Sequence, residues 1–168
     1  PWRPGGAPAA PAAEGMAALA AAMRCLDDGG LVLVKGVGGY QLACRADRAA
    51  PVARLRAAKQ RDAKPFALLM ADLAMVQRWC HVDATEAASL QGAAGPIVLL
   101  RQRADAPMLA PAVAPGQTTW GVMLPASPLH HALMDRRAGP LVLTSGNLSG
   151  APQPIALTEA WQIGRAHV

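Results

Sequence analysis

Three lysines are the residues of this chain whose type and spacing best indicate chemistry. Of its 16 basic residues only Lys35, Lys59 and Lys64 are lysines, and the last two bracket Arg61. The ammonium group of lysine is a compact point charge whereas guanidinium is a planar fork, so the two are not equivalent at a phosphate or another small anion. In a chain rich in Ala, Arg, Gly and Pro, these lysines predict one site for an anionic substrate. A chance cluster is the alternative.

A polar loop is the second candidate for a binding element. Residues 144–150 follow a short apolar run and contain two glycines and four side chains that can hydrogen-bond. Such a loop can present backbone N–H groups and hydroxyls to a phosphate. The alternative interpretation is an ordinary tight turn before another element.

Three further motifs are assigned structural roles. Residues 35–39 resemble a dinucleotide fingerprint, but the third glycine is missing and an extended run follows, so a Rossmann site is rejected. His130 and His131 have no third ligand at a suitable spacing and are expected at the surface, at the start of a helix. Asp27 and Asp28 are expected to end a helix. We therefore predict no metal site.

The composition predicts a globular cytoplasmic domain. The chain has 168 residues, is 52% hydrophobic and 16% charged, and contains no run near the roughly 20 apolar residues of a membrane span. Cys25, Cys44 and Cys80 form no CxxC pair, which argues against a disulfide framework or a zinc site. The net charge of +5 is dispersed except around residues 54–64, which favours a local anion pocket over a nucleic-acid surface.

Short strands alternate with helices along the chain, which predicts an α/β or mixed α+β domain whose helices cover a sheet. Strands are expected over residues 31–34, 40–44, 66–70, 97–100, 121–124 and 141–143. Helices are expected over residues 15–28, 51–60, 73–79, 85–90 and 129–137. In the second helix Arg54 and Arg56 are predicted to face outward, and Thr85 is the predicted cap of the fourth.

Both ends of the chain are expected to lie outside the domain, which we place at residues 14–162. Residues 1–13 are a Pro/Ala/Gly segment typical of a linker. Residues 163–168 match the translation of a common sequencing adapter, so we expect a non-native tail and a domain truncated at its C-terminus.

Taken together, residues 31–44, 55–70, 96–101, 119–131 and 140–150 resemble the YrdC-like family in order and spacing. The resemblance covers residues 29–154. It implies a twisted mixed sheet flanked by helices, with a concave basic cavity in which a carbamate is adenylated. The Lys-x-Arg and Ser-x-Asn signature of the family matches Lys59, Arg61, Ser145 and Asn147.

Within that family the chain resembles the HypF carbamoyltransferases of hydrogenase maturation. The tRNA-modifying relatives carry a threonine-binding Thr where this chain has Lys35, an arginine where it has Met123, and often a polar residue where it has Lys64. The resemblance implies formation of carbamoyl-adenylate from ATP and carbamate derived from carbamoyl phosphate, a step toward the cyanide ligand of [NiFe]-hydrogenase. The implied protein partner is the acceptor HypE, reached through a full-length enzyme that adds acylphosphatase-like, zinc-finger and Kae1-type domains.

The resemblance also implies the roles of single residues. Lys59 and Arg61 are the catalytic candidates, and Lys35 and Met123 would face the carbamate end. ATP is the implied cofactor, with Mg²⁺ accompanying it and no zinc in this segment. Nucleotide-binding residues are expected to be Lys59, Arg61, Lys64, Thr119, Ser145 and Asn147.

Three alternatives stay open. One is threonylcarbamoyl-AMP synthesis for tRNA modification, which Lys35 and Met123 disfavour. Another is a double-stranded RNA-binding module, which the scarcity of aromatic residues for base stacking disfavours. The third is the related domain of antibiotic O-carbamoyltransferases.

Overall fold

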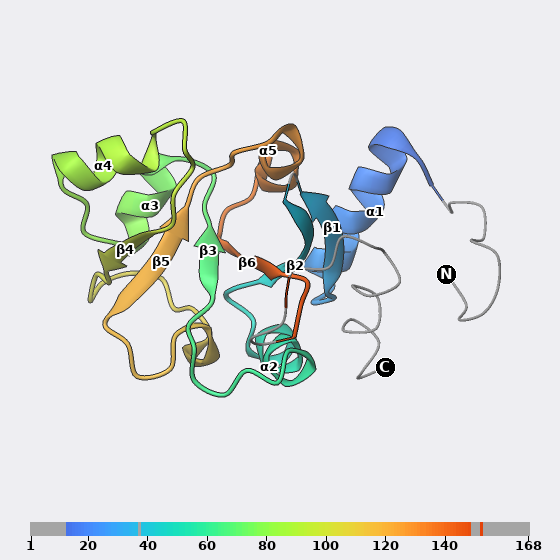
Figure 1. Cartoon of the computed structure of the whole chain (residues 1–168), viewed down its shortest axis with the longest axis horizontal. Helices are drawn as coiled ribbons and strands as arrows, with labels where there is room; N and C mark the ends of the chain where they lie inside the picture. The colour runs from blue at the N-terminus through green and yellow to red at the C-terminus, as the bar shows by residue number, and fades with distance from the viewer. Residues whose placement is uncertain (1–12, 37, 149–151, 153–168) are drawn as a thin grey trace.

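A six-stranded mixed sheet runs through the molecule (Figure 1). The structure is a computed structural model that describes residues 13–36, 38–148 and 152. The sheet has the strand order β1-β2-β6-β3-β5-β4, and all neighbouring strands are antiparallel except β3 and β5. The strands are β1 (Val32–Gly36), β2 (Gly39–Arg45), β3 (Ala67–Leu69), β4 (Val98–Arg101), β5 (Thr119–Met123) and β6 (Leu141–Ser145). The predicted mixed class is confirmed.

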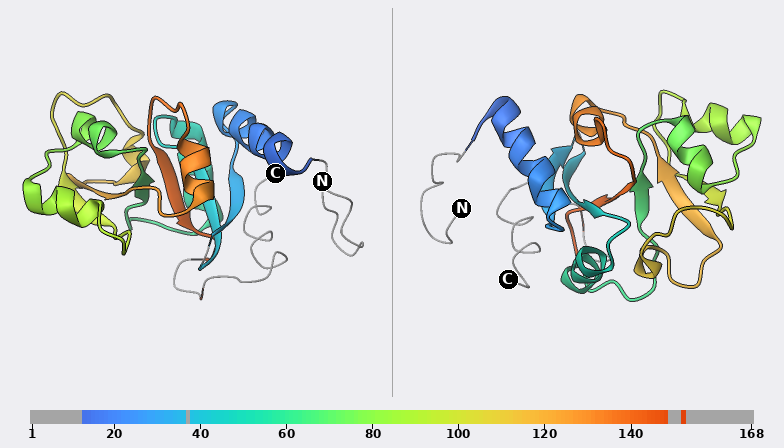
Figure 2. Two further views of the ribbon diagram at one scale, coloured as in Figure 1. Left: turned by 90° about the horizontal axis from the view of Figure 1, so that it is seen from above. Right: turned by 180° about the vertical axis from the view of Figure 1, so that it is seen from behind.

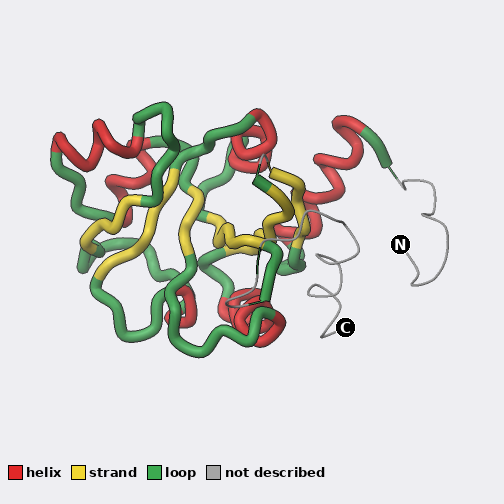
Figure 3. Tube along the Cα trace, viewed as in Figure 1, coloured by secondary structure: helices red, strands yellow, loops and turns green. Residues whose placement is uncertain are grey.

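In the described part of the chain five α-helices flank the strands. Figure 3 shows them in red around the yellow sheet. They are α1 (Gly15–Asp27), α2 (Ala49–Ala58), α3 (Leu73–Trp79), α4 (Ala84–Leu90) and α5 (Pro128–Met134), and a short 3₁₀ turn, η1, spans Pro111–Val113. The views agree that α1 lies beside β1 whereas α3 and α4 lie near β4 and β5 (Figures 1 and 2). None of the described helices combines the length and hydrophobicity that crossing a bilayer requires.

The two faces of the sheet differ in composition. Successive residues of a strand point to opposite faces, and directly paired residues share a face. On one face Leu42, Leu68, Val122 and Val142 are at most 1% exposed, and they belong to a core cluster that also contains residues of the other face and apolar side chains from all five helices. Burying each such side chain contributes about 1.5–3 kcal/mol to folding.

The other face carries a row of small and medium residues across five strands, from β2 to β4. The register pairs Ala43 with Leu143, Leu143 with Ala67, Ala67 with Gly121, and Gly121 with Leu99. Ala67 has only a methyl side chain and Gly121 has none, so the middle of this row rises little above the backbone of the sheet. A side chain at position 121 would come within 3.0 Å of Ile97 Cγ2. The pairing of these strands thus forms the floor of a depression on this face of the sheet.

Two local predictions are wrong. Thr85 does not cap α4, because the Asp83 side chain accepts a hydrogen bond from the Glu86 N–H while the Glu86 side chain accepts one from Asp83, which makes a capping box. His130 is not at the surface, since it is 6% exposed, whereas His131 beside it is exposed. Asp27 does end α1, as predicted.

The predicted linker at residues 1–13 and the predicted tail at 163–168 concern segments that, apart from residue 13, lie outside the described residues. Both stay predictions.

Candidate functional site

The low face of the sheet carries a cavity of about 590 Å³, which we call the sheet cavity. Leu143, Ala67 and Gly121 form its floor. Among the described residues that line it there are two cations, Arg61 and Lys64, and no Asp or Glu. Its lining residues are Gln41, Arg61, Lys64, Pro65, Phe66, Ala67, Ile97, Leu99, Gln117, Thr119, Gly121, Met123, Leu143, Thr144 and Ser145. Several predicted site residues from three distant parts of the chain therefore meet here.

Lys59 is not part of the lining of this cavity, but it contacts Ser145, which is. It follows the last residue of α2, and its side chain is 1% exposed. The Lys59 ammonium donates to the backbone carbonyl of Ser145, to that of Asn147 at 2.6 Å, and to Asn147 Oδ1 at 3.4 Å. An ammonium has three N–H groups, so these contacts use all of them. Lys59 thus binds the predicted Ser-x-Asn loop directly.

The environment of Lys59 lowers the pKa of its ammonium group to about 8 from the usual 10.5. Burial is the larger cause, because removing an ion from water disfavours the charged form. The positive charge of Arg61 acts in the same direction. An anion bound nearby would favour the charged form of Lys59.

Arg61 is held in place by the loop that follows α2. Its Nε donates to the carbonyl of Lys64 at 2.8 Å, and its Nη2 donates to the carbonyl of Pro65. Its guanidinium also lies 4.9 Å from the ring centroid of Phe66. In the described part of the chain, Nη1 of Arg61 has no hydrogen-bond partner, so this end of the fork is available to an anion lying in the sheet cavity.

Arg56 supports the same loop, and the prediction that it faces outward is wrong. It is half-buried, and its Nε donates to the carbonyl of Ala112 at 3.0 Å while Nη1 donates to that of Arg61 at 2.8 Å. Its guanidinium lies 4.7 Å from the centroid of Phe66. Burial lowers the pKa of both guanidinium groups, which remain charged in water at neutral pH. The helical spacing of residue 56 gave no indication of this role.

The Ser145–Asn147 loop is closed by its own side chains as well as by Lys59. The Ser145 hydroxyl donates to Asn147 Oδ1. Gly146 N–H donates to the Tyr40 carbonyl at 2.7 Å, and a side chain at Gly146 would lie 3.0 Å from that oxygen. A Cβ at this position would therefore require the backbone of Tyr40 to move by a few tenths of an ångström. The loop is thus held by hydrogen bonds to β2, to Lys59 and between its own side chains.

The remaining predicted residues divide between the two faces of the sheet. Thr119 and Met123 lie at opposite ends of β5 and both line the sheet cavity. Lys35 pairs with Tyr40 in β1 and β2, so its side chain starts from the face opposite the cavity, and its ammonium lies 5.7 Å from the Tyr40 ring centroid. The structure does not bring Lys35 to the other cations.

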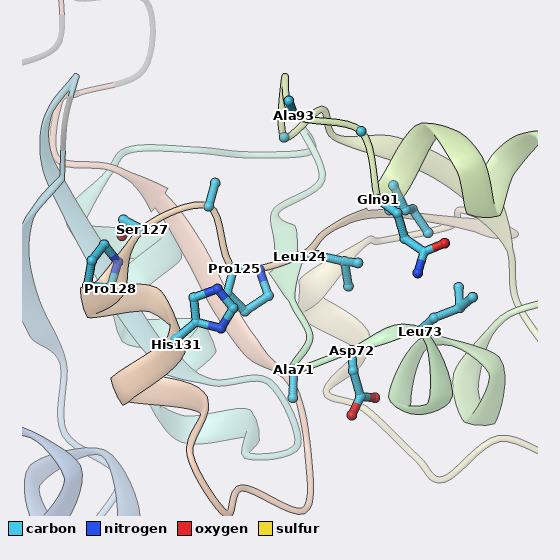
Figure 4. A pocket seen from close by; sticks show the side chains of 14 residues that line it. Ala71, Asp72, Leu73, Gln91, Ala93, Leu124, Pro125, Ser127, Pro128 and His131 are labelled. Carbon is cyan, nitrogen blue, oxygen red and sulfur yellow. The ribbon is translucent and has the colours of Figure 1, made fainter.

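A second cavity of about 590 Å³ lies at the other end of the strands, between α3 and α5 (Figure 4). Asp72, Gln91 and His131 extend toward it from the start of α3, the end of α4 and the first half of α5. The Asp72 carboxylate is already the cap of α3, accepting from Met75 N–H at 2.7 Å. This cavity has no Lys or Arg in its described lining, so it is poorly suited to a polyphosphate.

No group of three His, Cys, Asp or Glu side chains that could bind a metal exists among the described residues. The described lining of the sheet cavity also has no carboxylate, so no side chain there provides the carboxylate ligand by which proteins usually bind Mg²⁺.

Comparison with known proteins agrees with this fold. The family model of the Sua5, YciO and YrdC proteins, described as "Telomere recombination", matches residues 24–166. The chain therefore belongs to the Sua5/YciO/YrdC family.

Within the family the chain matches the YrdC-like region of HypF carbamoyltransferases. It is 48% identical over 143 residues to the carbamoyltransferase HypF of Rhodobacter capsulatus and 42% identical over 151 residues to HypF2 of Cupriavidus necator. These alignments cover 85% and 82% of this chain but only 19% of each relative, so the chain spans about a fifth of their length. Threonylcarbamoyl-AMP synthase of Bos taurus is 31% identical over 143 residues, which are 84% of this chain and 51% of that protein.

Solved structures give the same assignment. A full-length HypF in its phosphate- and nucleotide-bound form superposes with a TM-score of 0.81 at 38% identity, over 86% of this chain and 19% of that one. Sua5 of P. abyssi complexed with L-threonine has a TM-score of 0.71 at 23% identity over 84% of this chain and 42% of its own, and shows the shared fold. These relatives support a transferase role of the carbamoyl-adenylate type.

Proposed function

We propose that this domain forms carbamoyl-adenylate from ATP and carbamate in the sheet cavity. The observation that carries the proposal is the buried Lys59 ammonium, which binds the Ser145–Asn147 loop beside a cavity whose described charged lining residues, Arg61 and Lys64, are both cations. Such an arrangement favours a ligand with several negative charges. A triphosphate has them, and the similarity to carbamoyltransferases supplies the chemical class.

In the proposed reaction a carbamate oxygen attacks the α-phosphorus of ATP. The new P–O bond forms as the bond from the α-phosphorus to the bridging oxygen breaks, and pyrophosphate leaves with the electron pair. Such a transfer depends on positioning the reactants and on stabilising negative charge on the phosphates. Arg61 Nη1 and the Lys64 ammonium would bind the departing phosphates. The loop of Ser145 and Asn147 would bind the part of the nucleotide that remains.

Mg²⁺ would neutralise phosphate charge if it entered with ATP. The described side chains of the sheet cavity offer it no carboxylate, so we assign it no protein ligands. No step above requires them.

The wider role is proposed from the relatives. The resemblance to HypF favours carbamate derived from carbamoyl phosphate as the substrate, hydrogenase maturation as the process and HypE as the eventual partner. Met123 lines the sheet cavity where tRNA-modifying relatives carry an arginine for the amino-acid carboxylate, so the cavity has one cation fewer for threonine. An uncompensated buried carboxylate is costly.

ATP–pyrophosphate exchange tests the proposal on this chain. Freshly dissolved ammonium carbamate should drive exchange, whereas threonine with bicarbonate should not. Exchange driven by threonine above the carbamate rate would favour threonylcarbamoyl-AMP synthesis, the activity of the Bos taurus relative. Failure to bind ATP would contradict both activities.

A further inference from the structure

Gln41 is a polar residue of the sheet cavity that the sequence did not single out. It lies on β2 directly opposite Ser145 of β6, and both side chains line the cavity. Directly opposed residues of an antiparallel pair have Cβ atoms about 4.5–5.5 Å apart. Gln41 therefore lies next to the loop that we assign to the nucleotide. In the proposed adenylate the carbamoyl group is attached to the nucleotide phosphate, so Gln41 is placed to contact that group.

The amide of Gln41 is oriented by a buried histidine. Nδ1 of His130 accepts a hydrogen bond from Ala126 N–H at 3.4 Å, and Nε2 lies 3.1 Å from Oε1 of Gln41. Because Nδ1 is the acceptor, the ring hydrogen is on Nε2, which donates to that oxygen. Burial, followed by the charge of His131, lowers the pKa of His130 and favours this neutral ring.

The backbone leaves room for this arrangement at Gly36. A side chain added there would lie 2.8 Å from Oε1 of Gln41, in the space that the amide occupies. A methyl group at position 36 would therefore displace the glutamine from His130 without altering either residue.

With its oxygen engaged by His130, Gln41 can offer a ligand only the two N–H bonds of Nε2. Nε2 has no hydrogen-bond partner in the part of the chain that the structure describes. A carbamate that attacks through one oxygen retains a second oxygen, which becomes the carbonyl of the adenylate and accepts hydrogen bonds. A fixed N–H donor beside Ser145 is complementary to that oxygen.

We infer that Gln41 binds the carbonyl oxygen at the carbamate end of the substrate, and that His130 is a positioning residue which holds the Gln41 amide in the donating orientation. The inference rests on the proposed function and extends it, because it assigns the acyl end of the site to Gln41 in place of Lys35, whose side chain starts from the opposite face of the sheet.

The test measures the effects of a substitution on ATP binding and on carbamate use separately. Ammonium carbamate serves as the probe in ATP–pyrophosphate exchange, and calorimetry gives the ATP dissociation constant. Gln41→Met keeps the length of the side chain but removes the donor, so we expect the KM for carbamate to rise about tenfold or more, with ATP affinity within about twofold of wild type. Gly36→Ala and His130→Ala should shift the KM in the same direction. Gln77→Met, an exposed change on α3, is the matched control and should change neither quantity.

Each outcome decides the inference. An unchanged KM for carbamate in folded Gln41→Met overturns it while the proposed function stands. If ATP affinity falls by the same factor as the KM for carbamate rises, the role of Gln41 is structural and the inference is also overturned. If Gln41→Met does not fold, Gly36→Ala decides on the same readouts. A wild-type chain without carbamate-dependent exchange overturns the proposed function, and this inference with it.

Discussion

The ammonium nitrogen of Lys59 lies 2.6 Å from the backbone carbonyl oxygen of Asn147, although 88 residues separate them in sequence. This contact joins the end of α2 to the loop after β6 and connects the two halves of the Lys-x-Arg and Ser-x-Asn signature. Under the proposed function Lys59 would act on the nucleotide through the loop and through its charge, whereas Arg61 and Lys64 lie in the lining of the cavity.

Nucleotide affinity is expected to fall as the pH rises through about 8, where the Lys59 ammonium loses its proton. Losing one charge-assisted interaction should weaken binding by about tenfold or more. Calorimetric titration of ATP on both sides of that pH measures the change. In Lys59→Met the affinity should be low at each pH and this step should be absent. A step of the same size in the variant would contradict the assignment.

The stability of the free protein should follow the opposite trend. The pKa of Lys59 is lowered on folding, so between about pH 8 and 10.5 the unfolded chain binds more protons than the folded protein. The contribution of Lys59 to the free energy of unfolding therefore increases with pH across that window, and it is least favourable below about pH 8. Urea denaturation of wild type and Lys59→Met across the window, compared at each pH, isolates this contribution.

Arg61→Ala should weaken ATP binding more than tenfold while leaving the protein folded. The change removes a charge-assisted hydrogen bond, worth roughly 1.5–3 kcal/mol, from the side of the cavity assigned to the departing phosphates. Arg48→Ala removes the same charge from the exposed residue before α2, at the far end of that helix, and is the control. Equal ATP affinities in the two variants would remove Arg61 from the site.

Ser145→Ala and Asn147→Ala should reduce ATP affinity with little effect on stability. Leu143 is an unsuitable core control because it forms part of the cavity floor. Leu68 lies on the opposite face of the sheet and is fully buried, so Leu68→Ala should cost about 2–5 kcal/mol of stability and spare nucleotide binding. Thermal unfolding and calorimetry on the same samples separate the effects. Loop variants that unfold as readily as Leu68→Ala would make the loop purely structural.

Arg56→Lys should weaken ATP binding although Arg56 is not part of the cavity lining. Lysine cannot bind the carbonyls of Ala112 and Arg61 with the same planar fork, so the loop that positions Arg61 loses its support. Leaving such carbonyls unpaired costs about 1–3 kcal/mol. Arg48→Lys serves as the control. Wild-type ATP affinity in Arg56→Lys would show that the loop holds Arg61 without it.

The sequence alone determined the elements that depend on local pattern. Residues 73–79 were predicted as a helix with the bounds that α3 has, and the other helices and strands differ by a few residues at their ends. The neighbours Lys59, Arg61 and Lys64 could be recognised as one cluster because they are also close in the chain. The two signature motifs pointed to the Sua5/YciO/YrdC family, which the comparisons confirm.

The tertiary structure alone decided which side chains share a face and which are buried. Strand register is a non-local property, so no local pattern places Gln41 opposite Ser145 or turns Lys35 to the other face. Burial of a polar residue depends on partners from distant segments, and this is why His130 and Arg56 were assigned to the surface. The same reason applies to Lys59, whose pKa is lowered by burial among distant segments, while the carbonyl groups of Ser145 and Asn147 bind its desolvated ammonium.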